Sequence, residues 1–400
     1  MIRTLMAATA LATLASPAFA ETISVAPGDG AQERLQEALI LAEPGDEIVL
    51  AAGRFDLTDG LSLDVDGVTV RGAGMHASVL DFSGQQGAGE GLLVTSDGVT
   101  LRNFGMENPK GDGIKSKGAD DIVYQGVRVT WTNGPAATNG AYGLYPVEST
   151  GILIDGCEVS GASDAGIYVG QSSRITVRNS TARSNVAGIE IENTQYADVY
   201  GNLAEDNTGG LVVFDLPGNV VVGRDVKIHD NIIRNNNRKN YAPSGTVRQI
   251  PAGTGTFALA SRRVEITNNT FENNKTGDIA LLSGLAIEAD ASKWALDPEK
   301  LIGKVDDLDL ITDEGGVYNY RVENIVIAGN THSGSGLKPD TSSVYYRPIG
   351  FLLAVLYNGA PSDSVMYGTI GESAFDPEDP TKNSNDNYIC VGGNTEGTFA

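Results

Sequence analysis

Short runs of alternating apolar and polar residues recur along most of this chain. Successive copies begin at Gly143, Gly166, Gly188 and Gly210, at intervals of 23, 22 and 22 residues. A fixed interval of this length is typical of a solenoid in which each repeat forms one turn. Such a repeat accommodates about two or three short strands with corners between them, but not a strand and a packed helix. The sequence therefore predicts an all-β fold, a right-handed single-stranded parallel β-helix.

Alternation within each run predicts which side chains face the core. In the copy that begins at Gly166, Ile167 and Val169 point inward, because the side chains of a strand alternate between its two faces. The residues expected to stack on these two in neighbouring coils are Leu144, Ile189, Leu211, Ile191 and Val213.

A second alternating run in each copy ends in an asparagine. These asparagines are Asn202, Asn231, Asn269 and Asn330. Stacked at one corner, they can hydrogen-bond along the helix axis and satisfy amides that the turn would otherwise bury unpaired.

The two cysteines can be placed by the same register. Cys157 occupies the inward corner position that asparagine holds in later copies, whereas Cys390 falls at an outward position near the C-terminus. The coils between them separate the two by about 29 Å or more. No disulfide can form over that distance.

The pattern is interrupted at the N-terminal end and by insertions. Residues 32–42 carry apolar side chains at helical spacing, which predicts a short helix that caps the first coil. The expected insertions lie near residues 130–142, 235–251, 288–320 and 338–347, the third being acidic with a short helix near residues 298–305. The 45 residues from Gly210 to Gly255 fit either two coils or one coil with a loop. Residues 389–394 predict a last coil.

Residues 1–20 resemble a secretory signal peptide. Arg3 precedes an apolar stretch, and Ala18 and Ala20 form a small-x-small cleavage site ahead of Glu21. The apolar stretch is too short to span a bilayer, which disfavours a membrane anchor. We expect residues 21–400 to form one soluble β-helix domain that is periplasmic or secreted.

The charge of the chain narrows its partners. The net charge is −23, and loss of residues 1–20, which hold one arginine and no acid, lowers it by one to −24. This charge argues against nucleic acid and anionic lipid as partners. It would also repel an acidic polysaccharide, unless local lysines or a bridging divalent cation reverse the sign at the site.

The repeat, the capping helix and the signal together resemble the exported bacterial right-handed parallel β-helix repeat proteins of the pectate-lyase-like superfamily. The resemblance covers nearly the whole chain after residue 20. That superfamily includes polysaccharide lyases, uronate epimerases, glycoside hydrolases and groups of unassigned activity, and the sequence is most similar to the last. It lacks the Asp-Pro-His-Asp of mannuronan epimerases and the combination of Asn-Thr-Asp, Asp-Asp and His-Gly of polygalacturonases. The resemblance therefore implies the fold and assigns no catalytic residue.

Outward positions of successive coils form columns on one sheet. The columns at the second, fourth and fifth places after each coil glycine hold Lys115, Tyr145, Tyr168, Glu190 and Val212; Lys117, Val147, Gly170, Glu192 and Phe214; and Glu148, Gln171, Asn193 and Asp215. A face of aromatic, amide and charged side chains resembles a saccharide groove, although any solenoid places polar residues outside. The residues expected to contact the sugar are Trp131, Tyr142, Glu148, Gln171, Asn193 and Phe214. We expect Gly170 to leave a hollow, and Trp131 or Tyr142 to form a wall on which a ring stacks.

Two pairs of residues on this face suit elimination or epimerisation at a uronate. Such an enzyme must neutralise the carboxylate and remove the C5 proton. Lys115 and Lys117 lie about 7 Å apart on one strand, where mutual repulsion would favour loss of a proton from one amine. Tyr145 and Tyr168 are alternative bases. Each residue would serve equally well as part of a solvated surface.

Three carboxylates on the same face suit a cation or hydrolysis. Glu190, Glu192 and Asp215 could hold Ca²⁺, which prefers several oxygen ligands. Glycoside hydrolysis requires two carboxyl groups that flank one bond, and Glu192 with Asp215 is a better pair for this than Glu190 with Glu192. We rank hydrolysis below elimination.

Histidine chemistry has little support in the sequence. His76, His229 and His332 are far apart in the repeat and are interpreted as surface or corner residues. No Cys-x-x-Cys-His motif is present, so a haem or copper site has no basis. Apart from a Ca²⁺ ion, we expect no cofactor.

These observations predict an exported, monomeric β-helix that binds polysaccharide, with lyase or epimerase action on an acidic glycan as the leading reaction. The alternative is a non-catalytic binding or scaffold protein that uses its late loops to hold another exported protein. The sequence specifies neither the glycan nor the linkage.

Overall fold

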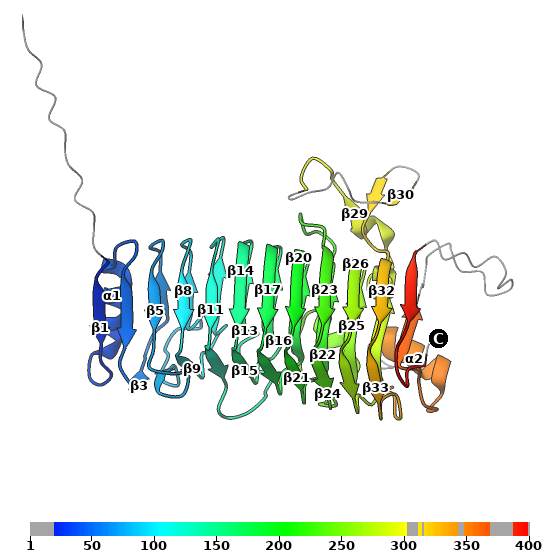
Figure 1. The fold of residues 1–400 in the computed structure, drawn as a ribbon, viewed down its shortest axis with the longest axis horizontal. Coiled ribbons are helices and arrows are strands. Elements are labelled where there is room, and N and C mark those ends of the chain that lie inside the picture. The colour runs from blue at the N-terminus through cyan, green and yellow to red at the C-terminus, as the bar shows by residue number, and fades with distance from the viewer. Residues whose placement is uncertain (1–19, 302–310, 314–315, 343–347, 369–386, 399–400) are drawn as a thin grey trace, which may run out of the picture.

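The chain winds into coils that stack along one axis as a right-handed parallel β-helix (Figure 1). The computed structural model describes residues 20–301, 311–313, 316–342, 348–368 and 387–398. Within these residues, each coil contributes one strand to each of three parallel sheets, A, B and C, which hold 12, 10 and 10 strands. The all-β fold predicted from the repeat is confirmed.

Sheet A consists of β1 (Thr22–Val25), β2 (Glu47–Leu50), β5 (Thr69–Arg71), β8 (Thr100–Arg102), β11 (Val123–Gln125), β14 (Thr150–Asp155), β17 (Ser173–Arg178), β20 (Gln195–Tyr200), β23 (Arg224–His229), β26 (Arg262–Thr267), β32 (Glu323–Ala328) and β35 (Ile389–Gly392). Sheet B consists of β3 (Gly53–Asp56), β6 (Ser78–Asp81), β9 (Gly105–Glu107), β12 (Arg128–Thr130), β15 (Glu158–Ser160), β18 (Thr181–Arg183), β21 (Leu203–Glu205), β24 (Ile232–Arg234), β27 (Thr270–Glu272) and β33 (Thr331–Ser333). Sheet C consists of β4 (Leu61–Leu63), β7 (Leu92–Val94), β10 (Ile114–Lys117), β13 (Tyr142–Val147), β16 (Ala165–Gly170), β19 (Ala187–Glu192), β22 (Gly209–Phe214), β25 (Thr254–Leu259), β28 (Gly277–Leu282) and β34 (Val365–Gly368).

The inward side chains stack as the alternation predicts. Leu144 is aligned with Ile167, which is aligned with Ile189 and then with Leu211. Ile167 and Ile189 are fully buried. One continuous hydrophobic core therefore runs the length of the solenoid.

The asparagine ladder at the corner between sheets A and B is confirmed. The side-chain amide of Asn202 donates to Oδ1 of Asn231 at 3.0 Å, and Asn231 donates to Asn269 at 3.0 Å. The ladder continues through Asn330 to Asn394. Cys157 occupies the equivalent corner in an earlier coil, where it is buried and free, whereas Cys390 is exposed and free.

A second asparagine ladder lies at the corner between sheets B and C, and the sequence interpretation missed it. Its members are Asn185, Asn207, Asn236 and Asn274, which are linked by amide hydrogen bonds of 3.0–3.2 Å. This ladder explains the glycine that begins each copy, since a Cβ on Gly166 would lie 2.6 Å from Nδ2 of Asn185. Three of these asparagines follow ladder residues of the first corner by five positions, which is the signal that could have revealed them.

The capping helix and the last coil also follow the prediction. Helix α1 (Ala31–Leu41) buries Leu35 and Leu39 against the first coils. Strand β35 pairs with β32 at the other end. Strand β22 pairs directly with β25, so the long interval between Gly210 and Gly255 is one coil with loops rather than two coils.

The insertions form short elements on the outside of the solenoid. They include the 3-10 helices η1 (Thr246–Gln249), η2 (Gly284–Ala286) and η3 (Ala291–Trp294), a small antiparallel sheet of β29 (Ala295–Leu296), β30 (Ile311–Asp313) and β31 (Gly316–Tyr318), and the helix α2 (Pro348–Tyr357). The sequence interpretation did not predict α2. Of the helix expected near residues 298–305, residues 298–301 are not helical and residues 302–305 lie outside the described residues, as do residues 343–347 of the last insertion.

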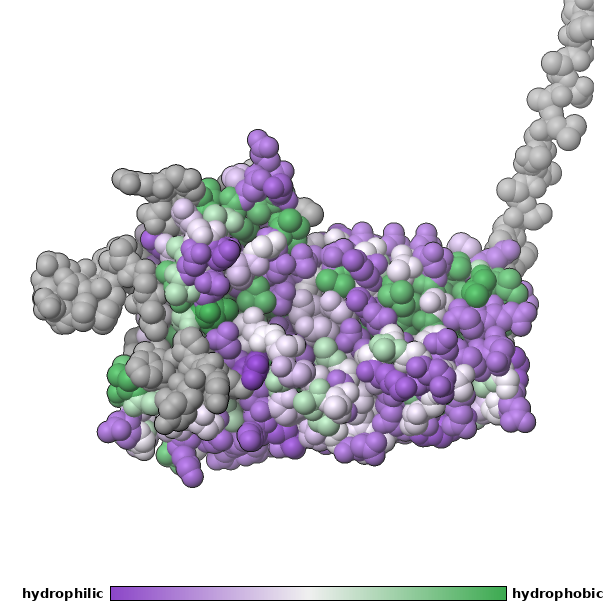
Figure 2. All heavy atoms as spheres, turned by 180° about the vertical axis from the view of Figure 1, so that it is seen from behind, coloured by the Kyte–Doolittle hydropathy of each residue, from purple (hydrophilic) through white to green (hydrophobic). Residues whose placement is uncertain are grey.

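The outer face of sheet C is divided between an open part and a covered part. Over the C-terminal coils, residues such as Phe214, Phe257 and Trp294 form a second hydrophobic core with the insertions. Over the N-terminal coils, Ser62 and Lys117 are exposed. Seen from behind, most of the molecular surface is hydrophilic and its hydrophobic residues form separate patches (Figure 2). Among the described residues, no helix has both the length and the apolar character needed to cross a membrane.

Candidate active site

A cluster of three tyrosines and three carboxyl groups lies on the outer face of sheet C, where the open part meets the covered part. Its members, here called the carboxyl–tyrosine cluster, are Tyr142, Tyr145, Asp164, Tyr168, Glu190 and Glu192. Strands β13, β16 and β19 position all of them except Asp164, which precedes β16.

The columns predicted from the sequence are present in the strand register. Lys115 is aligned with Tyr145, and Tyr168 with Glu190. Gly170 is likewise aligned with Glu192. The parallel register therefore brings residues of successive repeats side by side on one face.

The tyrosine rings pack on one another. Tyr142 lies 4.5 Å from Tyr168 and 4.6 Å from Tyr145, measured between ring centroids. A Cβ placed on Gly170 would collide with the phenol of Tyr168, so the hollow expected over Gly170 is filled by that ring. The hydroxyl of Tyr168 hydrogen-bonds to Glu192.

The carboxyl groups are held together in a poorly solvated place. Glu190 is only 2% exposed and shares a hydrogen bond with Asp164, which also accepts one from the hydroxyl of Tyr142 at 3.4 Å. Among the described residues, Asp164 Oδ1 and Glu190 Oε2 are buried without a hydrogen-bond partner. Buried carboxylate oxygens without partners are unusual and mark a site with chemical potential.

Burial and mutual repulsion raise the pKa values of all three acids. Burial, followed by the charge of Glu192, raises the pKa of Asp164 to about 7. Burial also raises the pKa of Glu192 to about 7, although hydrogen bonds from Tyr168 and Asn219 oppose the shift. The pKa of Glu190 is raised well above its ordinary value by burial and by the charges of its two neighbours. Near neutral pH, the three groups therefore retain protons that ordinary carboxyl groups would have lost.

Two loops flank the cluster. In the loop between β22 and β23, Asn219 donates to Glu192 at 3.3 Å and to Asn193 at 2.7 Å. In the loop that follows β24, Gly245 lies beside Asp164, since an added Cβ would be 3.3 Å from Oδ2. Tyr241 anchors that second loop by donating to the carbonyl groups of Ala162 and Ser184.

The two lysines expected to act as bases are each paired with a carboxylate. Lys115 lies 3.3 Å from Glu90 and 4.9 Å from the centre of the Tyr145 ring. Lys117 lies 3.6 Å from Glu148 at the surface. The structure therefore directs each ammonium to an acid rather than to the other lysine.

Three residues expected to contact a sugar are buried instead. Trp131 is 6% exposed and its indole donates to the carbonyl of Pro109, so the ring does not form an open wall. Phe214 packs against Phe257 in the second core. Asn193 holds the loop between β22 and β23 by donating to the carbonyl of Val221 at 2.8 Å. The sequence could not reveal these orientations because the covering loops come from distant insertions.

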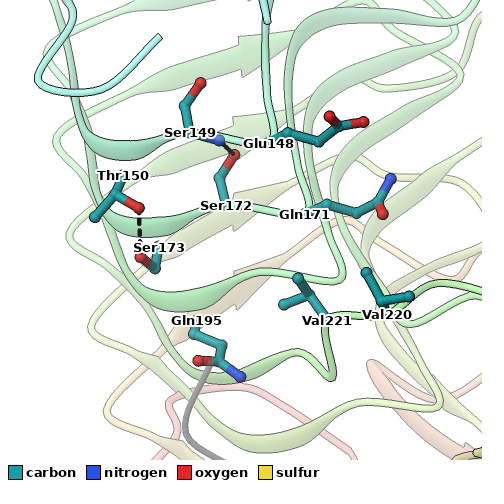
Figure 3. A pocket seen from close by; sticks show the side chains of 9 residues that line it. All are labelled: Glu148, Ser149, Thr150, Gln171, Ser172, Ser173, Gln195, Val220 and Val221. Atoms are coloured by element: carbon teal, nitrogen blue, oxygen red, sulfur yellow. Dashed lines mark hydrogen bonds between the residues drawn. The ribbon is translucent and has the colours of Figure 1, made fainter. Parts of the chain in front are cut away.

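Glu148 and Gln171 lie together, but away from the carboxyl–tyrosine cluster. Both line a pocket at the corner between sheets C and A (Figure 3). Their grouping follows from the register, in which the residues after β13 and β16 stack.

The three acids assigned to Ca²⁺ point to different partners. Glu190 contacts Asp164, and Glu192 contacts Tyr168 and Asn219. Asp215 is 2% exposed and accepts hydrogen bonds of 2.8 Å from the Gly223 amide and the Asn319 side chain. In the part of the chain that the structure describes, no group of three or more His, Cys, Asp or Glu side chains is arranged to hold a metal ion. A calcium site at these residues stays a prediction from the sequence.

Asp164 and Asn219 are the site residues that the sequence interpretation missed. Asp164 stands just before a strand, where an acid is usually a corner residue. Asn219 belongs to a loop whose path the repeat does not define. Only the folded chain shows that both reach the cluster.

Solved structures with this fold include several proteins named for glycan chemistry. A polygalacturonase from Erwinia carotovora ssp. carotovora shares 11% identity, with 82% of this chain and 96% of that chain covered and a TM-score of 0.51. The A-module of a mannuronan C-5 epimerase from Azotobacter vinelandii shares 14% identity, with 92% and 94% covered and a TM-score of 0.48. A DFA-IIIase from Arthrobacter chlorophenolicus A6 shares 12% identity, with 93% and 98% covered and a TM-score of 0.49. At such identities the likeness is one of fold alone.

No curated protein sequence matches the chain. The family model described as "Right handed beta helix region" matches residues 90–292, which is just over half of the 400 residues. This match agrees with the strand register and with the stacked core. The chain belongs to the right-handed β-helix family.

Proposed function

We propose that this protein is a carbohydrate-active enzyme that hydrolyses a glycosidic bond at the carboxyl–tyrosine cluster. The observation that carries the proposal is the pair Asp164 and Glu192, both half-buried, with pKa values raised to about 7. Glycoside hydrolysis uses one protonated carboxyl group to donate to the leaving oxygen and one ionised group to activate water or attack the sugar.

The pair meets both requirements at neutral pH. The negative charge of Glu192 raises the pKa of Asp164, so loss of one proton makes loss of the second harder. Close to pH 7, one of the two is therefore protonated while the other is ionised. Glu190 lies beneath them and serves as a positioning residue, because it shares a hydrogen bond with Asp164 and is itself inaccessible.

The contacts favour hydrolysis over the lyase or epimerase reaction expected from the sequence. Burial raises the pKa of Tyr145 to about 12 and raises the pKa values of Tyr142 and Tyr168 further, so these phenols are poor bases at neutral pH. Lys115 and Lys117 face carboxylates, and an ion-paired ammonium is a poor base. Both pairings also leave little positive charge for a uronate carboxylate.

A glycan with few negative charges is the substrate that suits this face. The three tyrosine rings offer apolar surface for a sugar ring, while Asp112 and Glu90 add further acids beside Lys115. Burial raises the pKa of Asp112. The polygalacturonase, whose name refers to a glycan, is an example of this fold in glycan chemistry, and its likeness supports no more than that.

We also propose that the protein acts after export, as a monomer, in the periplasm or outside the cell. The support is the signal-like character of residues 1–20. N-terminal sequencing of the exported protein should begin at Glu21. A protein that retains residues 1–20 after export would contradict this.

The function can be tested with the exported chain and a panel of neutral and uronate polysaccharides, with and without Ca²⁺. New reducing ends without ultraviolet absorbance, abolished by Glu192→Gln, are the expected result. Absorbance from unsaturated uronate ends would establish a lyase instead. Silence in both signals on every glycan would contradict hydrolysis and favour the non-catalytic scaffold.

A further inference from the structure

A trough runs along the corner at which sheet C turns into sheet A, next to the carboxyl–tyrosine cluster. It has a volume of about 420 Å³. Glu148 and Gln171 project on one side, serine and threonine side chains lie on the other, and Val220 and Val221 close one end (Figure 3). This volume is within the range of sites for small molecules. We call it the corner trough.

The lining of the corner trough is rich in neutral hydrogen-bonding groups. Ser172 donates to the carbonyl of Gly170 at 2.7 Å and accepts from the Ser149 amide at 3.1 Å. Ser173 donates to the hydroxyl of Thr150 at 3.2 Å. These contacts fix the hydroxyl groups in position and leave lone pairs for a ligand. Among the described residues, the side-chain amide of Gln171 has no hydrogen-bond partner, so it can both donate and accept.

The corner trough carries almost no net charge. Its one ionisable side chain, Glu148, lies 3.6 Å from the ammonium of Lys117. A uronate carboxylate placed here would meet Glu148 and no unpaired cation of the lining. Fixed hydroxyl and amide groups instead match the hydroxyl groups of an uncharged sugar.

The corner trough is continuous with the cluster through shared backbone. The amide of Gln171 donates to the carbonyl of Glu192 at 2.9 Å, and Gln171 follows Gly170, over which the phenol of Tyr168 lies. Asn219, which contacts Glu192, directly precedes the valines that close the trough. A glycan whose scissile bond lay at the cluster would therefore have a neighbouring unit within reach of the trough.

From these contacts we infer that the corner trough is a subsite for an uncharged sugar unit adjacent to the bond that is cleaved. The inference rests on the proposed function and extends it, because it assigns a neutral glycan as the substrate class. Gln171 is the residue expected to discriminate, since its amide is the one flexible and unpartnered group of the lining.

The test measures binding rather than turnover. Calorimetric titration of the Glu192→Gln protein with cello-, xylo-, manno- and fructo-oligosaccharides of two to six units is compared with titration of the same protein carrying Gln171→Gly. Gln171 has φ 48°, a left-handed conformation that glycine adopts without strain, so this change removes the side chain alone. The matched control is Asn179→Gly, at φ 51° beyond the other end of β17. A second variant, Val221→Phe, narrows the trough.

We expect Gln171→Gly and Val221→Phe each to weaken binding of a longer neutral oligosaccharide about tenfold, with the disaccharide and Asn179→Gly little affected. Equal affinity in all variants would overturn the subsite and leave the proposed function intact. Binding of hexagalacturonate but of no neutral oligosaccharide would overturn the subsite as well. If no oligosaccharide binds, the subsite is also refuted, and the separate assay of reducing ends decides whether the proposed function fails with it.

Discussion

The outer face of sheet C differs between its N-terminal and C-terminal coils. On the N-terminal side, Lys115 and Lys117 pair with nearby acids at a surface that water reaches. On the C-terminal side, Phe214 and Phe257 lie under insertions and are at most 1% exposed. The same strand geometry therefore supports a solvated face in one region and a second hydrophobic core in the other.

The carboxyl–tyrosine cluster lies at the border between these regions. Its acids lose enough water for their pKa values to rise, as the value of about 7 for Glu192 shows, yet Asp164 and Glu192 remain partly exposed. Farther toward the N-terminus, such acids would be solvated and ionised. Farther toward the C-terminus, they would be inaccessible. The comparison teaches that the insertions, rather than the repeat, create the chemistry.

The largest expected effect is on turnover. Glu192→Gln removes the ionisable group at the border, and we expect the rate to fall by about 10²- to 10⁴-fold, the usual contribution of a general acid or base. The matched control is Glu265→Gln, which removes an exposed acid paired with Lys227 on sheet A. Equal loss in both variants, or in neither, would contradict the role of the border.

The next effect is on stability and compares the two regions directly. Trp294 is 1% exposed and packs in the second core, so Trp294→Ala should cost about 3–5 kcal/mol. Leu93 is half-buried on the outward side of β7, and Leu93→Ala should cost about 1 kcal/mol or less. Denaturant unfolding measures both. Similar costs would show that the covered part is not a second core.

The third effect is the pH dependence of stability. The pKa of Glu192 is raised from 4.5 to about 7 in the folded chain, so the folded state holds the proton more tightly than the unfolded state. This contribution is fully present below pH 4.5 and is lost as the pH rises to about 7. Glu192→Gln, which cannot ionise, should therefore raise the melting temperature by a few degrees at pH 8 and change it little at pH 4.5. A variant that is less stable than the wild type at pH 8 would contradict the raised pKa.

The smallest expected effect concerns the open region. Lys117→Ala breaks one exposed ion pair with Glu148, and such pairs contribute little, so kcat/KM should fall by less than about fivefold. A loss of 10²-fold or more would instead assign Lys117 to the chemistry and return the interpretation to elimination. Steady-state kinetics on the best substrate of the panel distinguish the two.

The sequence predicted what the repeat controls. The stacking of Ile167 on Ile189, the Asn202 ladder and the alignment of Glu190 with Tyr168 all follow from a period of about 22 residues. It did not predict whether Phe214 faces water or a second core, because that depends on residues more than 40 positions away. Asp164 was missed for the same reason, since its neighbours come from the next coil and from the loop that holds Gly245.

The most direct test of the account is a titration of the carboxyl groups themselves. Carboxyl-¹³C NMR of the exported chain, with signals assigned by Asp164→Asn and Glu192→Gln, follows each ionisation from pH 3 to pH 9. The account predicts two coupled transitions close to pH 7, and a downward shift of the remaining transition when either partner is removed. Ionisation of both groups below pH 5, with no change on removal of the partner, would contradict it.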